Sequence, residues 1–290
     1  MTTLPAPSSA KAAALRSGLH RGWIEFRQLW TNRDDVTGQV LWLALFLSVI
    51  FFTRNASLPG TSLSLGAATV PGILGAGLVF NGLQGAAGYL IMDREDGTLL
   101  RAKATPNGML GYLVGKVMSL SLNQIIGMVT LLIPCLFLFP GLASDGAWSW
   151  LRLAWVVALG MLASMPIGAA IGSLVSNPRS MGLVVLPIMG LGAISGIFYP
   201  ITALPVWVQD VAQVFPMYWL GLGMRAALLP DSAVVLEIAH SWRPWATLGV
   251  LVAWSVIGLT LAPILLRRMA QRESGSTVAA RRERAMQRVG

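Results

Sequence analysis

Long runs without a charged side chain are the feature that most limits how this chain can fold. A helix crosses a lipid bilayer with about 20 mostly apolar residues, and six uncharged runs meet this requirement. They are residues 36–53, 55–92, 117–144, 153–178, 180–209 and 244–266, the second beginning with about ten polar, loop-like positions. Charged residues make up 11% of the chain, against about a quarter in soluble proteins. We therefore predict an all-α integral membrane protein with six transmembrane helices.

The positions of Lys and Arg predict how these helices are oriented. Positive residues near the ends of a span are retained in the cytoplasm. With the N-terminus inside, 17 of the 21 Lys and Arg residues are cytoplasmic. Those left outside are Arg54, Arg152, Arg225 and Arg243. We expect both termini in the cytoplasm of a bacterium, with the protein in the plasma (inner) membrane.

The segments before and after the spans are basic. Residues 1–35 should form a cytoplasmic N-terminus, 36–266 the six-span domain and 267–290 a basic cytoplasmic tail. The net charge of +9 suits contact with anionic lipids at both ends rather than with nucleic acid. The first 35 residues lack the apolar core, about 7–15 residues long, of a signal peptide, so the first span should be an uncleaved anchor.

An amphipathic helix is expected just before the first span. One narrow stripe at helical spacing holds Leu15, Leu19, Trp23, Phe26 and Trp30. Trp on an amphipathic helix that also carries Arg suits the headgroup layer of a membrane. We interpret this segment as an interfacial helix, with packing against a soluble partner as the alternative.

A charged cluster separates the second and third spans. Residues 93–106 begin with three acids in four positions, Asp93, Glu95 and Asp96, and end near Pro106. A solvated loop that merely keeps the topology explains the basic residues. It does not explain the acids, because acids contribute little to orientation.

Polar and small residues inside the spans indicate how the helices pack. The amide side chains at membrane depth are those of Asn81, Gln84, Asn123 and Gln124. We expect them to form hydrogen bonds between helices, and the alternative is that they line a substrate path. Glycines four residues apart allow helices to approach closely in lipid. Such pairs are Gly111 and Gly115, Gly168 and Gly172, and Gly192 and Gly196.

The segment from 200 to 230 is apolar but too interrupted to span. Pro200, Pro205 and Pro216 cut it into short pieces. We expect two short re-entrant helices dipping into the outer leaflet, with Trp207 and Trp219 at the level of the headgroups.

The sequence lacks the residues that nucleotide binding, metal binding and intramembrane catalysis require. A phosphate-binding loop needs Gly, four residues, then Gly-Lys-Ser/Thr. The segment Gly111–Val117 has the wrong spacing between its glycines and lacks the hydroxyl residue after Lys116. His20 and His240 fall on opposite sides of the membrane, and Cys135 is the single cysteine, so we expect no metal site. The spans contain no Asp, Glu or His, which argues against an intramembrane protease and a proton-driven pump. We expect no catalytic residue in this chain.

Two stretches resemble permeases of the type 2 class of ABC exporters, which includes drug and antibiotic efflux systems. One is Asp93-Arg94-Glu95-Asp96-Gly97-Thr98-Leu99 with Pro106 and Gly115-Lys116. The other comprises Gly196-Ile-Phe-Tyr-Pro200, Leu204-Pro205-Val-Trp207-Val-Gln209, Pro216-Met217-Tyr218 and Met224-Arg225. Asp93 departs from the family pattern, in which many members have Glu.

The resemblance implies a coupling helix seated in a groove of a separate ATPase. The residues concerned are Asp93, Arg94, Glu95, Asp96, Gly97, Thr98, Leu99, Lys103 and Pro106. Glu95 and Asp96 would face basic residues of the ATPase, while Asp93 and Arg94 would brace the second span to the coupling helix. The ATPase, in two copies, would bind ATP and magnesium, and this chain would bind no cofactor.

The resemblance also implies a second permease half, identical or different, with the substrate moving between the halves. The substrate path would include Phe80, Asn81, Gln84, Asn123 and Gln124. The outer re-entrant gate would include Phe198, Tyr199, Pro200, Pro205, Pro216 and Arg225. The favoured cargo is a small amphipathic drug, antibiotic or metabolite. The alternatives are a lipid-linked glycan or polysaccharide, and a passive channel, membrane scaffold or intramembrane enzyme.

Overall fold

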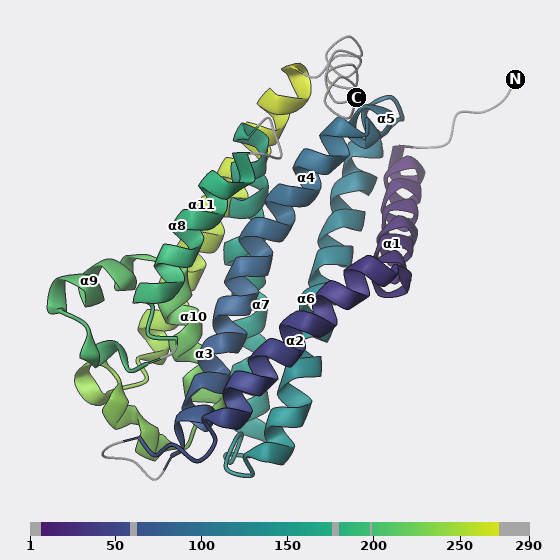
Figure 1. The fold of residues 1–290 in the computed structure, drawn as a ribbon. Coiled ribbons are helices and arrows are strands. Elements are labelled where there is room, and N and C mark those ends of the chain that lie inside the picture. Colours follow the sequence, from purple (N-terminus) through teal and green to yellow (C-terminus); the bar gives the residue numbers. More distant parts are fainter. Residues whose placement is uncertain (1–6, 59–62, 176–179, 198, 273–290) are drawn as a thin grey trace, which may run out of the picture.

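The computed structural model describes residues 7–58, 63–175, 180–197 and 199–272, and the basic tail beyond Arg272 lies outside them. Within these residues the secondary structure is helical, without a strand longer than an isolated bridge, as predicted (Figure 1). The longer helices are α1 (Pro7–Thr31), α2 (Arg33–Phe52), α3 (Leu65–Phe80), α4 (Ala86–Glu95), α5 (Thr98–Lys103), α6 (Gly108–Leu138), α7 (Ala147–Leu174), α8 (Met181–Ile194), α9 (Val206–Val214), α10 (Pro216–Leu228) and α11 (Pro244–Arg272). A π-helix, η1 (Asn81–Gly85), joins α3 to α4, and three 3₁₀ turns are η3 (Ile201–Ala203), η4 (Asp231–Leu236) and η5 (Ile238–His240).

Five helices of the described chain are long and apolar enough to cross a membrane. They are Arg33–Phe52, Leu65–Glu95, Gly108–Leu138, Ala147–Leu174 and Pro244–Met269. They correspond to five of the six predicted runs, and the helix of the second run begins at Leu65, after its polar start. The chain is thus a multi-pass, all-α membrane protein.

The predicted fifth span, 180–209, was wrong in its extent. Its apolar helix α8 has 14 residues, or about 21 Å at 1.5 Å per residue, less than the roughly 30 Å hydrocarbon core. The chain turns at Gly196, whose φ of 65° is left-handed and costs glycine little. Pro200 and Pro205 follow before α9 begins, so no continuous helix can form.

The core lies around α10. Every residue of α10 except Ala226 is buried, and the helix packs against α3, α7 and α11. Glycines allow the approach: a Cβ on Gly75 would lie 3.0 Å from the backbone nitrogen of Gly221. Pro216 begins α10 at a first-turn position, where its missing N–H is no loss.

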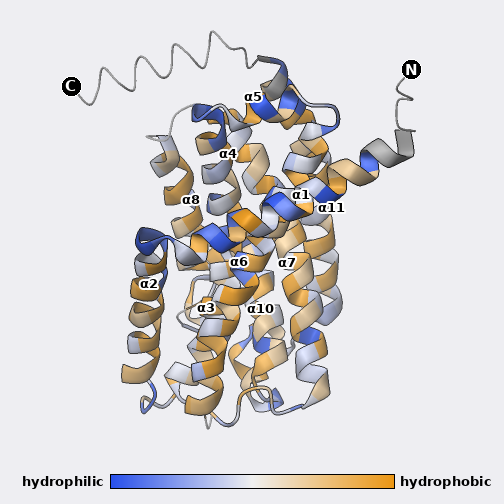
Figure 2. Cartoon of the chain, turned by 90° about the vertical axis from the view of Figure 1, so that its right-hand side faces the viewer, coloured by the Kyte–Doolittle hydropathy of each residue, from blue (hydrophilic) through white to orange (hydrophobic). Residues whose placement is uncertain are grey.

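Helix α1 lies across the other helices and is held on α6 (Figure 2). A Cβ on Gly18 or Gly22 would lie 2.5 Å from the carbonyl oxygen of Gly111 or Gly115, respectively. The two backbones are therefore in contact, and the predicted Gly111/Gly115 pair does pack closely, against α1.

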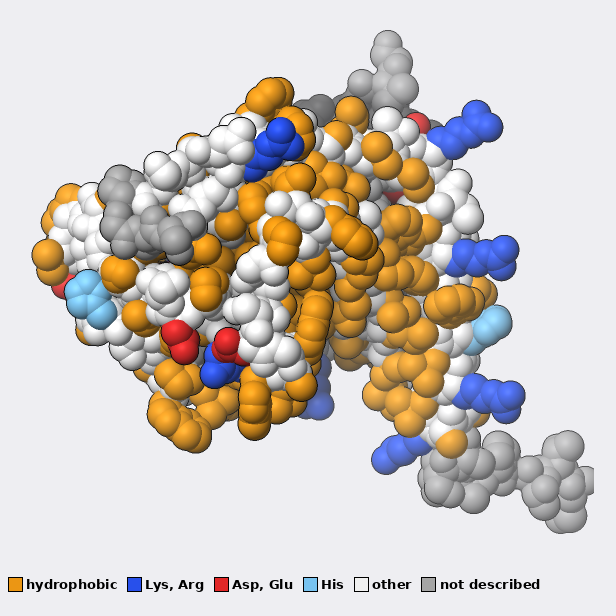
Figure 3. All heavy atoms as spheres, turned by 90° about the horizontal axis from the view of Figure 1, so that it is seen from below, with side chains coloured by type: hydrophobic (Ala, Val, Ile, Leu, Met, Phe, Trp, Pro, Cys, Tyr) orange, Lys and Arg blue, Asp and Glu red, His pale blue; other side chains and the backbone are white. Residues whose placement is uncertain are grey.

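The apolar stripe predicted on α1 is divided between two environments. Leu15, Leu19 and Trp23 are exposed, whereas Phe26 is buried. Figure 3 shows hydrophobic side chains along this helix, with Lys and Arg at its outer edge. An apolar surface thus stays open beside the small residues that contact α6.

Both described ends of the chain lie at one end of the molecule. The start of α1, the end of α11 and α5 are together in Figure 1, and the loops after α2 and α6 are at the opposite end. Helix α2 stands at the edge of the bundle (Figure 2) and is the least buried of the five long helices.

Candidate functional site

The turn between α4 and α5 is built from three consecutive residues of the predicted coupling segment. Gly97 has a φ of 77°, a left-handed conformation that reverses the chain. Asp96 accepts a hydrogen bond at its Oδ1 from the backbone N–H of Thr98, at 2.8 Å. This carboxylate stabilises the first turn of α5, since the free N–H groups there attract an acceptor.

One face of α5 is anchored in the protein. Leu99 and Ala102 are buried in a cluster with Leu90 of α4, Tyr112 of α6 and Met269 of α11. Other positions of the segment point outward, with Glu95, Asp96, Arg101, Lys103 and Pro106 all exposed. The short helix is therefore fixed to three long helices and presents a charged surface.

Asp93 and Arg94 tie α4 to other long helices, and each residue as a whole is 8% exposed. Asp93 Oδ2 lies 2.8 Å from Lys116 Nζ and accepts a hydrogen bond of 2.8 Å from the Tyr112 hydroxyl. Arg94 donates from Nη1 to the carbonyl oxygen of Val175 at the end of α7, at 2.9 Å. These contacts join the second span to α6 and α7, and the bracing of the span to α5 itself stays a prediction.

Helix α1 joins the same ionic network. Lys116 Nζ lies 3.0 Å from Glu25 Oε2, and Arg21 Nε donates to Glu25 Oε1 at 2.8 Å. Burial raises the pKa of Glu25, but hydrogen bonds and charge from Arg21 and Lys116 outweigh it and hold that pKa below its ordinary value. Glu25 is thus ionised at neutral pH. The sequence analysis missed this role, although Arg21 and Glu25 stand four apart, a spacing at which ion pairs form on a helix.

A cavity of about 570 Å³ opens beside this network. Its walls come from α1, the junction with α2, α4, α5 and α6. Charged residues of both signs line it: Arg21, Glu25, Asp35, Asp93, Asp96 and Lys116. The volume is typical of small-molecule sites, and the cavity separates the start of α2 from α4.

The predicted path residues fall at and opposite the π-helix. Phe80 is half-buried and Asn81 is exposed, donating from Nδ2 to Gly77 O of its own helix at 2.8 Å. Gln84 Oε1, Asn123 Oδ1 and both amide atoms of Gln124 are buried without a hydrogen-bond partner in the described chain. The expected hydrogen bonds between helices are therefore not formed by these four atoms.

Glycines of α7 pack on the π-helix and on α4. A Cβ on Gly168 would lie 2.5 Å from Leu83 O, and one on Gly172 would lie 2.7 Å from the Cα of Ala87. The prediction of close packing is confirmed for this pair. It was wrong for Gly192 and Gly196, because Gly192 makes only ordinary contacts and Gly196 forms the turn after α8.

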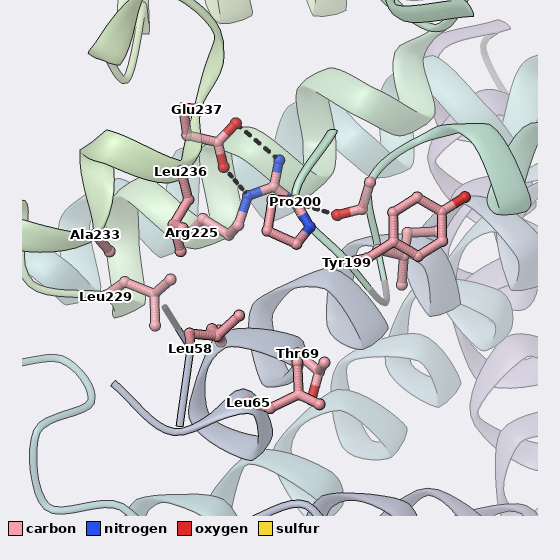
Figure 4. Close-up of a pocket in the computed structure, with 13 residues that line it drawn as sticks. Leu58, Leu65, Thr69, Tyr199, Pro200, Arg225, Leu229, Ala233, Leu236 and Glu237 are labelled. Atoms are coloured by element: carbon pink, nitrogen blue, oxygen red, sulfur yellow. Dashed lines mark hydrogen bonds and ion pairs between the residues drawn. The ribbon is translucent and has the colours of Figure 1, made fainter. Parts of the chain in front are cut away.

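A buried ion pair holds the opposite end of the molecule (Figure 4). Arg225 of α10 donates to both carboxylate oxygens of Glu237, which follows η4, and from Nη1 to Gly196 O at 3.2 Å. Arg225 is 6% exposed and Glu237 is 4% exposed. The adjacent cavity, of about 30 Å³, has room for about one water molecule. The sequence indicated Arg225 but not Glu237.

The other predicted outer residues are spread along this region. Tyr199 is exposed and bonds to the carbonyl oxygen of Ala193, Pro200 is half-buried, Pro205 is exposed and Pro216 is buried. Phe198 lies outside the described residues.

The two predicted short helices exist as α9 and α10. Helix α10 is buried among the long helices, whereas most of α9 is exposed. Trp254 Nε1 donates to Val214 O, at the junction of α9 and α10, at 2.9 Å. Trp254 is ten residues into α11, or about 15 Å along its axis. Trp207 is exposed as an interfacial residue should be, but Trp219 is buried. Trp219 is buried because α10 is inside the bundle, and its depth at the headgroups stays a prediction.

Long apolar helices, the short helix α5 anchored on them at one end and α10 buried among them define a multi-pass membrane domain. A sequence model described as ABC-2 type transporter matches residues 15–229, and the chain belongs to this family. It is therefore a permease subunit of an ABC exporter, a membrane component rather than the nucleotide-binding enzyme. Comparison with curated proteins found no match.

Proposed function

We propose that this permease moves a small amphipathic molecule outward, driven by a separate ATPase that seats on α5. The main support is the contrast between the two faces of the α5 region. Leu99 and Ala102 are buried against α4, α6 and α11, whereas Glu95 and Asp96, just before α5, are exposed. A rigid, charged projection of this kind suits docking into a basic groove of a soluble partner. ATP and magnesium would be bound by two copies of that partner.

The substrate passes between two permease halves in this proposal. Within one chain the centre is filled by α10, and the outer cavity is only about water-sized. We therefore place the passage at the interface of two related subunits, since ligand sites often lie at such interfaces. Exposed Asn81 and half-buried Phe80, with the amides of Gln84, Asn123 and Gln124 behind them, would contribute to its wall.

The proposed topology has six passages and both termini in the cytoplasm of a bacterial inner membrane. Helix α8 begins near the α5 end and α10 finishes near the opposite end (Figure 1), so together they would make the fifth passage. The exposed Leu15, Leu19 and Trp23 would place α1 in the headgroup layer. Basic residues of α1 and of the tail would contact anionic lipids.

A small amphipathic cargo fits the polar groups available. Amides and a Phe at the proposed path offer hydrogen bonds and apolar contact without a fixed charge. Export of a lipid-linked glycan would require a wider, aromatic-lined groove, and the half-buried Phe80 is the single aromatic residue among the proposed path positions.

The first test is purification of the tagged chain from native membranes in mild detergent, with identification and ATP hydrolysis of any bound soluble protein. Asp96 also stabilises the start of α5, so the variant should be Glu95→Ala/Asp96→Ser, in which Ser keeps an acceptor at this position. We expect it to lose the ATPase, while Asp34→Ala, at another exposed acid, retains it. Retention of a stoichiometric ATPase by the double variant would contradict the docking role. Absence of any ATPase from the folded wild-type chain would favour a passive channel or scaffold.

A further inference from the structure

We propose that Lys116 is the positioning residue that transmits movement of α5 to α1 and α2. This inference rests on the proposed function, because the movement originates in the ATPase. The Lys116 ammonium bridges two carboxylates that belong to different helices, at 2.8 Å to Asp93 of α4 and 3.0 Å to Glu25 of α1. Three helices thus meet at one nitrogen atom.

The bridge is shielded enough to act as a mechanical link. The side chain of Lys116 is 14% exposed, with Glu25 at 22% and Asp93 at 12%. Ion pairs in full contact with water contribute little, but partial burial weakens screening. The ammonium also lies 5.1 Å from the Tyr89 ring and 5.8 Å from the Tyr112 ring, so it has favourable contacts on several sides.

Movement at α5 reaches this bridge through short connections. Asp93 precedes the α4–α5 turn, and Tyr112 both packs in the cluster that holds Leu99 and donates to Asp93. A displacement of α5 therefore shifts the carboxylate that Lys116 contacts. Lys116 is on α6, which moves with the same cluster.

From Lys116 the displacement passes into α1 and then α2. Glu25 is paired with Arg21 on α1, and α1 and α2 are separated only by Asn32. Backbone bonds from Asn32 to Gln28 O and from Val36 to Asn32 O continue across this junction. Since α2 is the least buried long helix, it is the one that can move at the lowest cost in lost packing.

The cavity of about 570 Å³ gives this motion room. It separates α4 from the α1–α2 junction, and Lys116, Glu25 and Asp93 line it. The glycine contacts at Gly18 and Gly22 hold the preceding turns of α1 on α6, and the bridge adds the link from Glu25 to α4. Without it, α4 could move while the α1–α2 junction stayed behind. With the bridge in place, α2 moves whenever α5 is displaced.

The test measures nucleotide-driven movement of α2 in the complete complex with its ATPase. Spin labels are placed at Leu41→Cys on α2 and Ile264→Cys on α11, both exposed positions, in a Cys135→Ala background. An excess of unlabelled chain restricts the measured distance to one subunit. The distance is compared without nucleotide and with ATP plus vanadate in lipid nanodiscs.

We expect the distance to shift with nucleotide in the otherwise wild-type chain. In Lys116→Met the shift should be lost although the ATPase stays bound and hydrolyses ATP, and Lys116→Arg should restore it because a guanidinium can contact both acids. Lys11→Met removes an exposed lysine outside the network and should keep the full shift. Glu25→Gln, which leaves the Lys116–Asp93 pair intact and disturbs a less buried side chain, should lose the shift as Lys116→Met does.

An undiminished shift in folded Lys116→Met or in Glu25→Gln would overturn the role of Lys116 while leaving the exporter function intact. A wild-type chain that binds no ATPase would overturn the proposed function, and this inference with it. Loss of the shift in Lys11→Met as well would show that the bridge is not the specific link.

Discussion

At the scale of single residues, the pairing of Arg225 with Glu237 holds together the end of the molecule opposite α5. Removing two charges from water costs several kcal/mol for each ion, and their attraction repays this only when hydrogen bonds satisfy the remaining groups. Here both carboxylate oxygens of Glu237 and the carbonyl oxygen of Gly196 accept from Arg225. The pair therefore ties α10 to the turn after α8 and to the segment after η4.

Breaking this pair from one side should destabilise the protein. Arg225→Met leaves Glu237 charged and buried, and we expect a loss of about 3–5 kcal/mol of stability. The double variant Arg225→Met/Glu237→Leu should recover much of it, because neither charge then remains buried. Thermal unfolding in detergent, followed by size-exclusion chromatography, checks both. A single variant as stable as the wild type would show that Arg225 and Glu237 are not paired in the folded protein.

At the scale of elements, contact between two glycine-bearing helices sets where α1 lies. Ala14, Gly18, Gly22 and Phe26 form the buried side of α1, and the first three bring its backbone onto α6. Small residues serve this purpose in membranes because dispersion contacts there replace hydrophobic association. The position of α1 in turn brings Glu25 to Lys116.

A single methyl group tests this packing. In Gly18→Ala the new carbon meets the Gly111 carbonyl oxygen at 2.5 Å, and we expect the docking of α1 to weaken by about 1–3 kcal/mol. Trypsin should then cut faster after the exposed Arg16. The matched control is Gly38→Ala, where nothing lies within 4 Å of the new carbon and helix propensity improves by up to about 1 kcal/mol. Equal cleavage of the two variants would contradict tight α1–α6 contact.

At the scale of the whole molecule, the candidate functional features lie at opposite ends. One end holds α5, the start of α1 and the end of α11, and the other holds the loops after α2 and α6 (Figure 1). The ionic network of Lys116 is near the first end and the Arg225–Glu237 pair near the second. The proposed function assigns ATPase docking to the first end and the outer gate to the second.

The proposed orientation is checked by labelling single cysteines in a Cys135→Ala background. Trp148→Cys, at an exposed position beside the loop after α6, should react with a membrane-impermeant maleimide on spheroplasts. Lys11→Cys and Lys103→Cys should react only after permeabilisation, because both would be cytoplasmic. Reaction of Lys103→Cys in sealed spheroplasts would exclude the proposed topology.

The sequence alone was sufficient for the features that depend on composition and local pattern. Lipid imposes uncharged helical spans of a minimum length, so five long helices, the loop before Leu65 and two short helices after Pro205 could be predicted. Proline and glycine act through local backbone geometry, although the turn at Gly196, which shortens α8, was not foreseen. The type of membrane protein and the exposed charges of Glu95 and Asp96 followed from the same level of information.

Only the tertiary structure decided which residues meet. Glu25, Asp93 and Lys116 are far apart in the sequence, and helix patterns carry no information about which faces of α1, α4 and α6 turn toward one another. For the same reason Glu237 was not identified as the partner of Arg225, and the burial of Trp219 within the bundle was not predicted. Local pattern determined that the chain enters the membrane as helices, whereas long-range packing decided how α5 is anchored and which ion pairs join the helices.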